Sequence, residues 1–572
     1  MPDCRFNKIK VFGSVRLLVY LFVLTSALIP FWDSLLYGEL ISQNRRINWS
    51  PGVVGGIPTY PATRNAIADD GAVGNGVADD TAKIQLCLNS VSVNEACYLP
   101  AGTYKTTAEI HIPEGVVLRG AGPTKTKIIN YNSASGSDII SMGGSVEGAA
   151  INILSGYTKD STQIIVENAS SLVEGDFIVV YQDNNSIVDT FDCGWCGLNN
   201  DENHAMMQIV KITNKSGNTL TLNRPLYYTF EASQDPEVLE FEMIKGSGVE
   251  NLYVELNASA GDVRANIEIN QCANCWVRSV ESYNANRSHV LLTESYGCEV
   301  RDSYFHHGQQ YNGDHAYGAF IFVTNSDHLI ENNIFYHLRH SMILEGGGSG
   351  NVYGYNYSNR MFGDVDPNNT NWLMADIVTH GAHPYMNLFE GNVAQHLGAD
   401  YTHGSGSHNT FFRNQITREN LNYDNTLADQ HLFAVDISKF NYYLNVVGNV
   451  LGKSSQTFNA YEDSGTRIND SDRHVYSFGY SNDGDTTSDD AVSKNTVLRH
   501  GNYDYYNKNV VWDAGIADHS LPASYYLSSK PSFFGITPWP LFGPDLNPIV
   551  GTLPAEQRLK DIGNIPMPPT MK

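Results

Sequence analysis

The sequence predicts an all-β solenoid, a stack of coils built from short strands. After residue 245 the chain repeats: "LIENNIFYHL" at 329–338 and "LFEGNVAQHL" at 388–397 are identical at five of ten positions. The chain between the repeats consists of short β-type runs bounded by Gly, Asn and Asp, without a helical period. Repeats of about 20–50 residues are typical of solenoids, in which each unit packs only on its neighbours.

The second asparagine of the repeat motif, or the residue in its place, marks the register of each coil. An Asn amide at a stacked turn can donate to one neighbouring coil and accept from the other, so these positions predict a hydrogen-bonded ladder. The longer intervals between marks predict loops, which in solenoids tend to collect on the binding face. The marks fall at Ser303, Asn333, Asn356, Asn392, Gln415 and Asn449.

The first coil is expected near residue 65. Asp80 and Thr81 are expected to cap a helix over residues 82–89 that covers the open end of the solenoid. The acidic run before this helix lacks the spacing of an EF-hand calcium loop and is interpreted as a structural turn.

Three motifs in this region form a set: "DGAVGNGVADDTAKIQ", "LPAGTY" and "IPEGVVLRGAG". Together they resemble the start of the pectate-lyase-like right-handed parallel β-helix superfamily, with its rhamnogalacturonase/epimerase-like N-terminal motif. The tail over residues 521–544 resembles the end of bacterial proteins of this group. The resemblance implies a right-handed parallel β-helix and a glycan-active protein, and it names no substrate.

The N-terminus predicts export. Basic residues precede an apolar run at 17–32, as in a signal peptide or an uncleaved anchor, so the protein is expected to be secreted, periplasmic or on the cell surface. The expected organisation is a signal at 1–40, a linker at 41–64, the cap and first coils at 65–159, an inserted β subdomain at 160–235, the main coils with site loops at 236–500, and an extended segment packing on the solenoid at 501–572.

The cysteines suit an exported protein. Cys87 and Cys97 flank a link between helix and strand and could pair. The "CGWC" and "CANC" motifs favour local disulfides over a shared zinc site, with one cysteine left over. The "CGWC" loop lies between the two halves of the inserted subdomain and could reach the glycan-facing side.

The charge restricts the partners. Sixty-one Asp and Glu residues against 36 Lys and Arg give a formal charge of −25, which disfavours nucleic acid and anionic lipid. The expected partner is a polysaccharide, with membrane contact only through an uncleaved anchor, and a monomer is expected. No cofactor is assigned, and Ca²⁺ is considered only for a lyase.

Histidine is concentrated in one part of the solenoid. Thirteen of 18 histidines lie between His289 and His431, and no lysine occurs between Lys245 and Lys439. Four residues past the marks, a polar column is expected, either as a glycan-binding row or as a surface ladder of turn residues. Its members are His307, His337, Arg360, His396 and Glu419.

Glycoside hydrolysis needs two carboxylates, one as acid and one as base or nucleophile. The predicted catalytic residues, taken from acid- and histidine-rich loops, are Asp314, Asp376, Asp400, His340 and Glu345. The predicted substrate-binding residues are His307, His315, His337, Arg339, Arg360, His380, His383, His396, His403, Tyr385 and Tyr401.

Each aspartate could instead be a turn or cap residue. Glu331 and Glu390 share one repeat position, which favours a structural role for both. Asp376, His380 and His383 could alternatively bind a metal, although no metal site is assigned.

The favoured function is an exported polysaccharide-degrading enzyme, a glycoside hydrolase using paired carboxylates along the β-helix. The alternatives are a polysaccharide lyase acting by β-elimination on a uronate-containing glycan, and a non-catalytic glycan-binding or surface solenoid.

Overall fold

The computed structural model describes residues 40–562, apart from 133, 145, 258–262, 362, 364–372, 420–427, 429, 464–472 and 481–489. The predicted export segment therefore lies outside the described residues except for Leu40. No helix in the described part of the chain is both long enough and apolar enough to cross a membrane.

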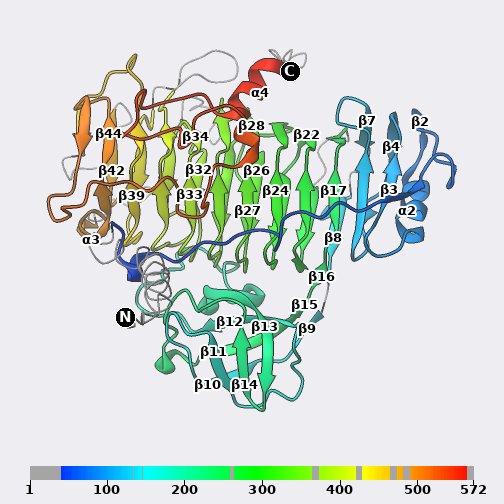
Figure 1. Cartoon of the computed structure of the whole chain (residues 1–572), viewed down its shortest axis with the longest axis horizontal. Helices are drawn as coiled ribbons and strands as arrows, with labels where there is room; N and C mark the ends of the chain where they lie inside the picture. The colour runs from blue at the N-terminus through cyan, green and yellow to red at the C-terminus, as the bar shows by residue number, and fades with distance from the viewer. Residues whose placement is uncertain are drawn as a thin grey trace, which may run out of the picture.

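The body of the molecule is a right-handed parallel β-helix with three long sheets, here named A, B and C (Figure 1). Sheet A has 12 strands and sheet B has 13, all parallel except for the last pairing of sheet B. Sheet C has 11 strands. The predicted fold class is confirmed.

The strands are short because each side of a coil is narrow. Sheet A contains β1 (Ala62–Asn65), β3 (Glu95–Leu99), β6 (Val116–Gly120), β17 (Gly248–Glu250), β21 (Trp276–Arg278), β24 (Glu299–Arg301), β27 (Leu329–Glu331), β30 (Val352–Gly354), β33 (Leu388–Glu390), β36 (Thr410–Phe412), β39 (Asn445–Val447) and β43 (Leu498–His500). Sheet B contains β2 (Asn75–Asp79), β4 (Gly102–Thr106), β7 (Thr126–Asn130), β18 (Tyr253–Leu256), β22 (Glu281–Ala285), β25 (Tyr304–Gly308), β28 (Ile334–Tyr336), β31 (Tyr357–Asn359), β34 (Val393–Ala394), β37 (Gln415–Ile416), β40 (Val450–Leu451), β44 (Asn502–Asp504) and β45 (Asn509–Val511). Sheet C contains β5 (Ile110–His111), β8 (Asp138–Gly143), β19 (Ala265–Asn270), β23 (Ser288–Thr293), β26 (Tyr317–Phe322), β29 (His340–Glu345), β32 (Ile377–Thr379), β35 (Leu397–Ala399), β38 (Val435–Ile437), β42 (His474–Phe478) and β41 (Ala460–Glu462).

The core runs along the inside of the coils. In-register pairing places like residues above one another, so Tyr353, Phe389 and Phe411 stack with ring centroids 5.0 and 5.2 Å apart. All three are fully buried. Burying one such side chain contributes roughly 1.5–3 kcal/mol, so a stack repeated along many coils stabilises the solenoid strongly.

The predicted asparagine ladder is present, with its register corrected at one coil. From Ser303 onward each backbone N–H donates to the side-chain oxygen of the next asparagine at 2.9–3.0 Å. The mark at Gln415 is wrong, because Asn414 takes that place. The position four residues on is therefore Arg418 and not Glu419. The ladder runs through Ser303, Asn333, Asn356, Asn392, Asn414, Asn449 and Asn502.

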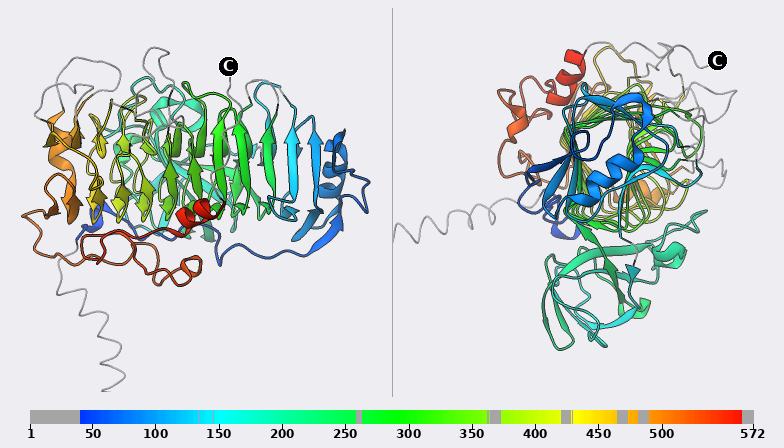
Figure 2. Two further views of the ribbon diagram at one scale, coloured as in Figure 1. Left: turned by 90° about the horizontal axis from the view of Figure 1, so that it is seen from above. Right: turned by 90° about the vertical axis from the view of Figure 1, so that its right-hand side faces the viewer.

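The predicted capping helix is confirmed as α2 (Thr81–Ser90), which covers the N-terminal end of the stack (Figure 2). Ile84, Cys87 and Leu88 are its buried residues. Asp80 does not cap this helix with its side chain, contrary to expectation. Its carboxylate accepts from the backbone N–H groups of Val73 and Gly74 and so fixes the preceding turn.

A seven-stranded, mainly antiparallel sheet hangs from one side of the β-helix (Figure 1). It includes residues on both sides of the expected 160–235 segment. Tyr385 on the β-helix donates to the carbonyl of Met207 at 3.0 Å and helps to attach it. Its strands are β9 (Val146–Glu147), β10 (Ile151–Ser155), β11 (Gln163–Val166), β12 (Phe177–Gln182), β13 (Met206–Ser216), β14 (Thr219–Leu222) and β15 (Glu237–Glu242).

The remaining elements are short. β16 (Ile244–Lys245) pairs with β20 (Cys272–Ala273). The other described helices are α3 (Ala491–Thr496) and α4 (Pro554–Ile562), with the 3-10 turns η1 (Gln43–Arg45), η2 (Leu198–Asn200), η3 (Glu202–His204), η4 (Ala232–Gln234) and η5 (Ser532–Phe534).

Both ends of the chain run back along the outside of the β-helix (Figure 1). The N-terminal strap, residues 40–61, reaches the late coils, where the Arg45 Nε donates to Asn445 at 2.9 Å. Further along, the Trp49 indole N–H donates to the Met386 carbonyl at 2.8 Å. The residues expected to be a linker therefore pack on the solenoid.

The C-terminal strap, residues 513–562, explains the two equivalent glutamates. Tyr526 donates its hydroxyl proton to Glu331 at 2.8 Å, and the backbone N–H of Tyr525 donates to Glu390 at 2.8 Å. Glu331 and Glu390 thus hold this strap, as the structural interpretation of their shared position expects.

Two of the three expected disulfides are present. Cys87 bonds Cys97, and Cys193 bonds Cys196 in the "CGWC" loop. The "CANC" disulfide is wrong: Cys272 and Cys275 are free and buried, as is Cys298. The Cys272 thiol donates to the carbonyl of Met142 inside the coil.

Candidate active site

The candidate site lies on the outer face of sheet C. Parallel pairing sets Leu344 of β29 opposite Thr379 of β32, and Thr379 opposite Ala399 of β35. The residue after each of these, Glu345, His380 or Asp400, therefore falls in one row across three coils. Neighbouring strands lie about 4.8 Å apart, so the three side chains meet.

A cavity of about 530 Å³ opens over this row. Residues from sheet C form its floor, and loops from three parts of the chain form its walls. The lining residues are Trp195, Arg287, Gly313, Asp314, Tyr317, Phe322, Arg339, Glu345, His380, Thr402 and His403.

Glu345 is a carboxyl that keeps its proton near neutral pH. Its side chain is buried at the end of β29, with 5% of the residue exposed. Burial disfavours the charged form and raises its pKa to about 7, although His380 and Arg287 oppose the rise. A carboxyl with such a pKa can donate a proton to a bound substrate.

His380 carries a positive charge in the same row. Its Nδ1–H donates to Asp400 at 2.6 Å. Burial works against the charge, but the carboxyls of Asp400 and Glu345 outweigh it and raise the pKa of His380 to about 9. For Asp400, burial favours the neutral acid, but the neighbouring imidazolium prevails and lowers the pKa of this carboxyl.

Two arginines add further positive charge. Arg287 forms an ion pair with Asp314 at 2.9 Å, and Arg339 donates to the hydroxyl of Tyr317 at 3.0 Å. The arginines precede β23 and β29 directly, so they occupy equivalent places at the start of sheet C strands. The cavity therefore combines one neutral carboxyl with several fixed charges.

The inserted subdomain supplies one wall. Trp195, between Cys193 and Cys196, lies 5.5 Å from Phe322 and 5.3 Å from His403, measured between ring centroids. Gly381 permits this approach, because a Cβ there would lie 3.0 Å from the Cys196 sulfur. The "CGWC" loop thus reaches the same face as the candidate carboxyls.

The structure brings together about half of the predicted site residues. Asp314, Arg339, Glu345, His380 and His403 line the cavity. Asp400 stands behind His380.

Two more predicted residues lie beside this group. The His340 Nδ1–H donates to the carbonyl of Ala375 at 2.7 Å, and its ring lies 6.4 Å from His380. Tyr401 donates to Asp189 of the inserted subdomain at 2.8 Å.

Asp376 lies apart from the cavity. It is fully buried, accepts from the Ser358 hydroxyl at 2.5 Å and from the backbone N–H of His396 at 3.0 Å. Burial raises its pKa to about 7. These bonds join sheet B to sheet C within the coil.

The expected polar column also lies away from the cavity. His307 and His337 touch, with ring centroids 4.8 Å apart, on the side of sheet B. Tyr336 of β28 pairs with Asn359 of β31, so Arg360 follows His337 as the next residue of this column. Burial and neighbouring histidine lower the pKa of His307 to about 3, so its imidazole is neutral. His396 turns instead toward the carbonyl of Leu373.

Three other predicted binding residues have local partners. His383 is buried between the hydroxyls of Ser405 and Ser407, and Tyr385 holds the inserted subdomain. His315 lies in a loop, with Nδ1 2.7 Å from the carbonyl of Gly313.

The three residues of the alternative metal site do not form one cluster. Asp376, His380 and His383 each have different partners, as described above. Within residues 40–562, outside the gaps already given, no group of three or more His, Cys, Asp or Glu side chains is arranged to hold a metal ion.

The sequence analysis did not identify Arg287, Phe322 and Thr402 as site residues. It expected the "CGWC" loop to reach the glycan-facing side but did not name Trp195. Arg287 carries no local motif. Its one signal is that it precedes a sheet C strand as Arg339 does, which becomes visible only when the coils are aligned.

Comparisons with known proteins agree with this architecture. Residues 63–359 match the family described as rhamnogalacturonase A/epimerase, pectate lyase-like. No match was found among the curated proteins.

Solved structures share the fold. The tailspike protein gp49 of Pseudomonas phage LKA1 is 16% identical with a TM-score of 0.50, over 69% of this chain and 64% of that chain. The tailspike gp61 of Pseudomonas phage phi297 is 14% identical with a TM-score of 0.53, over 74% of this chain and 71% of that one. The chain thus spans less than two-thirds of the length of gp49.

The family match covers more than half of the 572 residues and includes the first coils, the inserted sheet and the floor of the cavity as far as β29. The protein therefore belongs to the rhamnogalacturonase A/epimerase, pectate lyase-like family, which includes carbohydrate-active enzymes.

Proposed function

We propose that the protein is an exported polysaccharide-degrading glycoside hydrolase whose general acid is Glu345. The observation that carries the proposal is a buried carboxyl with a pKa of about 7 in a cavity that also contains a second carboxylate, Asp314. Hydrolysis of a glycosidic bond uses two carboxyl groups, one as proton donor and one as base or nucleophile. Export is inferred from the basic and apolar N-terminal sequence.

In the proposed reaction Glu345 donates its proton to the glycosidic oxygen as the bond to the anomeric carbon breaks. Asp314 either removes a proton from the attacking water or attacks the anomeric carbon itself. In the second case, water then releases the sugar and Glu345 recovers its proton. The charged His380 and Arg339 hold the sugar hydroxyl groups, and Trp195 offers an aromatic face to a sugar ring.

A second candidate is a polysaccharide lyase, favoured by the three cations Arg287, Arg339 and His380 around the cavity. They could hold the carboxylate of a uronate while a base removes the neighbouring proton and the glycosidic oxygen departs. A non-catalytic glycan-binding solenoid remains the third alternative, since fold does not determine function.

The test is incubation of the full chain with neutral and uronate-containing polysaccharides, measuring reducing ends and ultraviolet absorbance of unsaturated sugars. We expect new reducing ends without that absorbance. If both signals rise together the protein is a lyase, and if neither rises while the glycan is retained it is a binding protein. Glu345→Gln should lower kcat by about 10²-fold or more, the usual contribution of a general acid.

Glu390→Gln is the matched control. Glu390 is also buried, and burial raises its pKa to about 7 as well, but it binds the C-terminal strap. Its substitution should lower stability and leave kcat unchanged. Equal loss of kcat in both variants would contradict the assignment of Glu345.

A further inference from the structure

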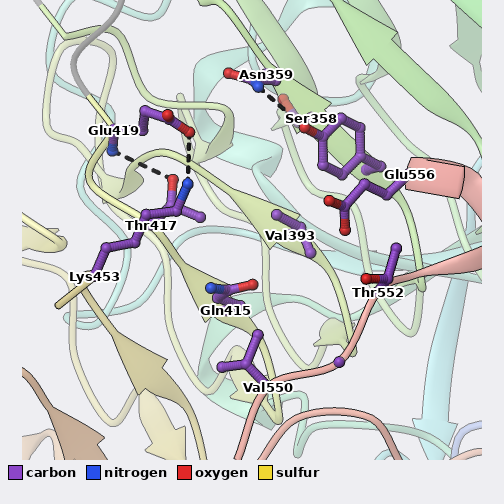
Figure 3. A pocket seen from close by; sticks show the side chains of 12 residues that line it. Ser358, Asn359, Val393, Gln415, Thr417, Glu419, Lys453, Val550, Thr552 and Glu556 are labelled. Carbon is purple, nitrogen blue, oxygen red and sulfur yellow. Dashed lines mark hydrogen bonds and ion pairs between the residues drawn. The ribbon is translucent and has the colours of Figure 1, made fainter. Parts of the chain in front are cut away.

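A second cavity, of about 270 Å³, lies on sheet B (Figure 3). One wall consists of the outward side chains of β31, β34 and β37, and the other is the C-terminal strap at residues 550–556. The residues that matter most here are Tyr357, Gln415, Glu419, Lys453, Thr552 and Glu556. None of them lines the candidate active site.

Gln415 is the feature that indicates a ligand. It is 9% exposed, and its side-chain amide makes no hydrogen bond within the described residues, whereas its backbone N–H donates to the carbonyl of Asn392 at 2.8 Å. Figure 3 shows the amide between Val393 and Val550, at the floor of the cavity. The amide atoms still reach solvent in the cavity, so a ligand that bonds them replaces bonds to water and gains about 0.5–1.5 kcal/mol for each hydrogen bond.

The other polar groups alternate between donors and acceptors. Lys453 pairs with Glu419 at 2.7 Å, and both side chains keep 36% of their surface exposed. Asn359 donates to the hydroxyl of Tyr357 at 3.0 Å. Such a mixture suits sugar hydroxyl groups, each of which donates one bond and accepts others.

The charge excludes acidic sugars. Each lining carboxylate is paired with a lysine at 2.7 Å, Glu419 with Lys453 and Glu556 with Lys560, so the cavity offers no unpaired cation to a uronate carboxylate. The candidate active site differs, because two arginines and a charged histidine surround it. The volume is below the roughly 300–1,000 Å³ of pockets for drug-sized ligands, which fits a single ring.

We propose that this cavity is a second glycan-binding site, which takes one neutral sugar residue of a polysaccharide. Gln415 and Thr552 bond its hydroxyl groups, Glu419 and Lys453 bond a neighbouring pair, and Val393 and Val550 pack on its C–H groups. The strap closes the site, so sheet B and the C-terminus must both be in place. The proposal needs binding only and is independent of the proposed hydrolysis.

Titration calorimetry of the full chain tests it, in the Glu345→Gln background to avoid turnover. The probes are gluco-, manno- and galacto-oligosaccharides, with oligogalacturonate as the acidic comparison. At least one neutral probe should bind at this cavity as well as at the candidate active site, and Gln415→Leu and Thr552→Trp should each weaken one of the two binding events at least tenfold. Lys105→Met, on sheet B at the far end of the stack, should leave it unchanged.

Thermal unfolding of each variant separates binding from folding. Thr552 is exposed, so Thr552→Trp fills the cavity without disturbing the core and decides the matter if Gln415→Leu fails to fold. The proposal is overturned if no neutral probe binds, or if folded Thr552→Trp protein binds the probe with the same affinities and stoichiometry as the Glu345→Gln parent.

Discussion

At the scale of residues, Glu345, His380 and Asp400 have different charge states although they follow one another in a single row. Burial alone would make all three neutral. The short bond between His380 and Asp400 makes that pair ionic, while Glu345 has no such partner among the described residues and stays protonated up to a pH of about 7. One row of a regular sheet thus offers a proton donor beside a fixed cation.

Asp400→Asn should lower activity at least tenfold, about 1.4 kcal/mol of transition-state stabilisation, because His380 then loses its charge at neutral pH. Stability should change with pH as well. The pKa of His380 rises from 6.5 to about 9 on folding, so the pair stabilises fully below pH 6.5 and this contribution disappears as the pH rises through about 9. The difference in unfolding free energy between wild type and Asp400→Asn, measured with urea, should shrink over that range.

Asp314→Asn is the control, because Asp314 forms an ion pair with Arg287 but its side chain is 61% exposed. Exposed pairs contribute about 0–1 kcal/mol, so its effect on stability should be small at every pH. A pH-independent difference for Asp400→Asn would show that His380 is neutral.

Much of this site could be predicted from sequence, and the limit has a physical cause. Asp314, Arg339 and His403 lie in turns and loops whose composition already differs from the rest, and Glu345, also expected in a loop, ends strand β29. Asp376 has the same local surroundings, but its side chain points into the coil, and only the register decides between inward and outward.

At the scale of elements, the disulfide loop of the inserted subdomain completes the cavity. The loop lies far from β29 and β32 along the chain, so the sequence alone does not show that it borders the cavity. It was nevertheless expected to reach the glycan-facing side. Besides Trp195, the loop contributes the backbone carbonyl of Asp192, 2.9 Å from the Nδ1 of His403. The insertion is therefore part of the site and not only an attachment.

Trp195→Ala should raise KM several-fold with little change in kcat, because an aromatic face binds the sugar in the ground state and transition state alike. Steady-state kinetics on the polysaccharide that the reducing-end assay identifies measure KM and kcat. Phe191→Ala is the matched control, since Phe191 lies in the same loop but stacks on Tyr401 outside the cavity. Equal changes in both variants would assign the effect to loop order.

At the scale of the whole molecule, the repeat, the turn residues and the N-terminal motifs were sufficient to predict the β-helix. The repeat was read one residue out of register at Gln415, because Asn414 and Gln415 carry similar amides and only the hydrogen bonds distinguish them. The C-terminal segment was expected to pack on the solenoid, but the N-terminal strap was interpreted as a linker, because an extended chain without periodicity reveals little about the surface that it covers.

Arg45→Met should destabilise the late coils. The Arg45 guanidinium donates to the carbonyls of Leu444 and Thr496 at 2.9 and 2.7 Å, as well as to Asn445. Bonds to a charged donor contribute about 1.5–3 kcal/mol each at most, so a loss on the order of 2 kcal/mol is expected. Hydrogen exchange should speed up in β39 and β43 first.

Arg46→Met is the neighbouring control. The Arg46 side chain donates to the carbonyl of Ile41, and its guanidinium lies over Tyr525. Its substitution should leave exchange in β39 and β43 slow. Faster exchange in both variants would mean that the whole strap detaches.

The N-terminal strap also has a consequence for synthesis on the ribosome. A stack of coils could otherwise fold progressively as each coil emerges, with contacts only to its predecessor. Here the first described residues must wait for partners about 400 positions later, since Arg45 bonds Asn445. The part of the strap over the early coils has nearer partners, such as Arg119 for Tyr60 and Glu299 for Val53, and can pack sooner. The part at Arg45 and Trp49 stays unpaired until the late coils are made, and its closure joins local units into one cooperative body.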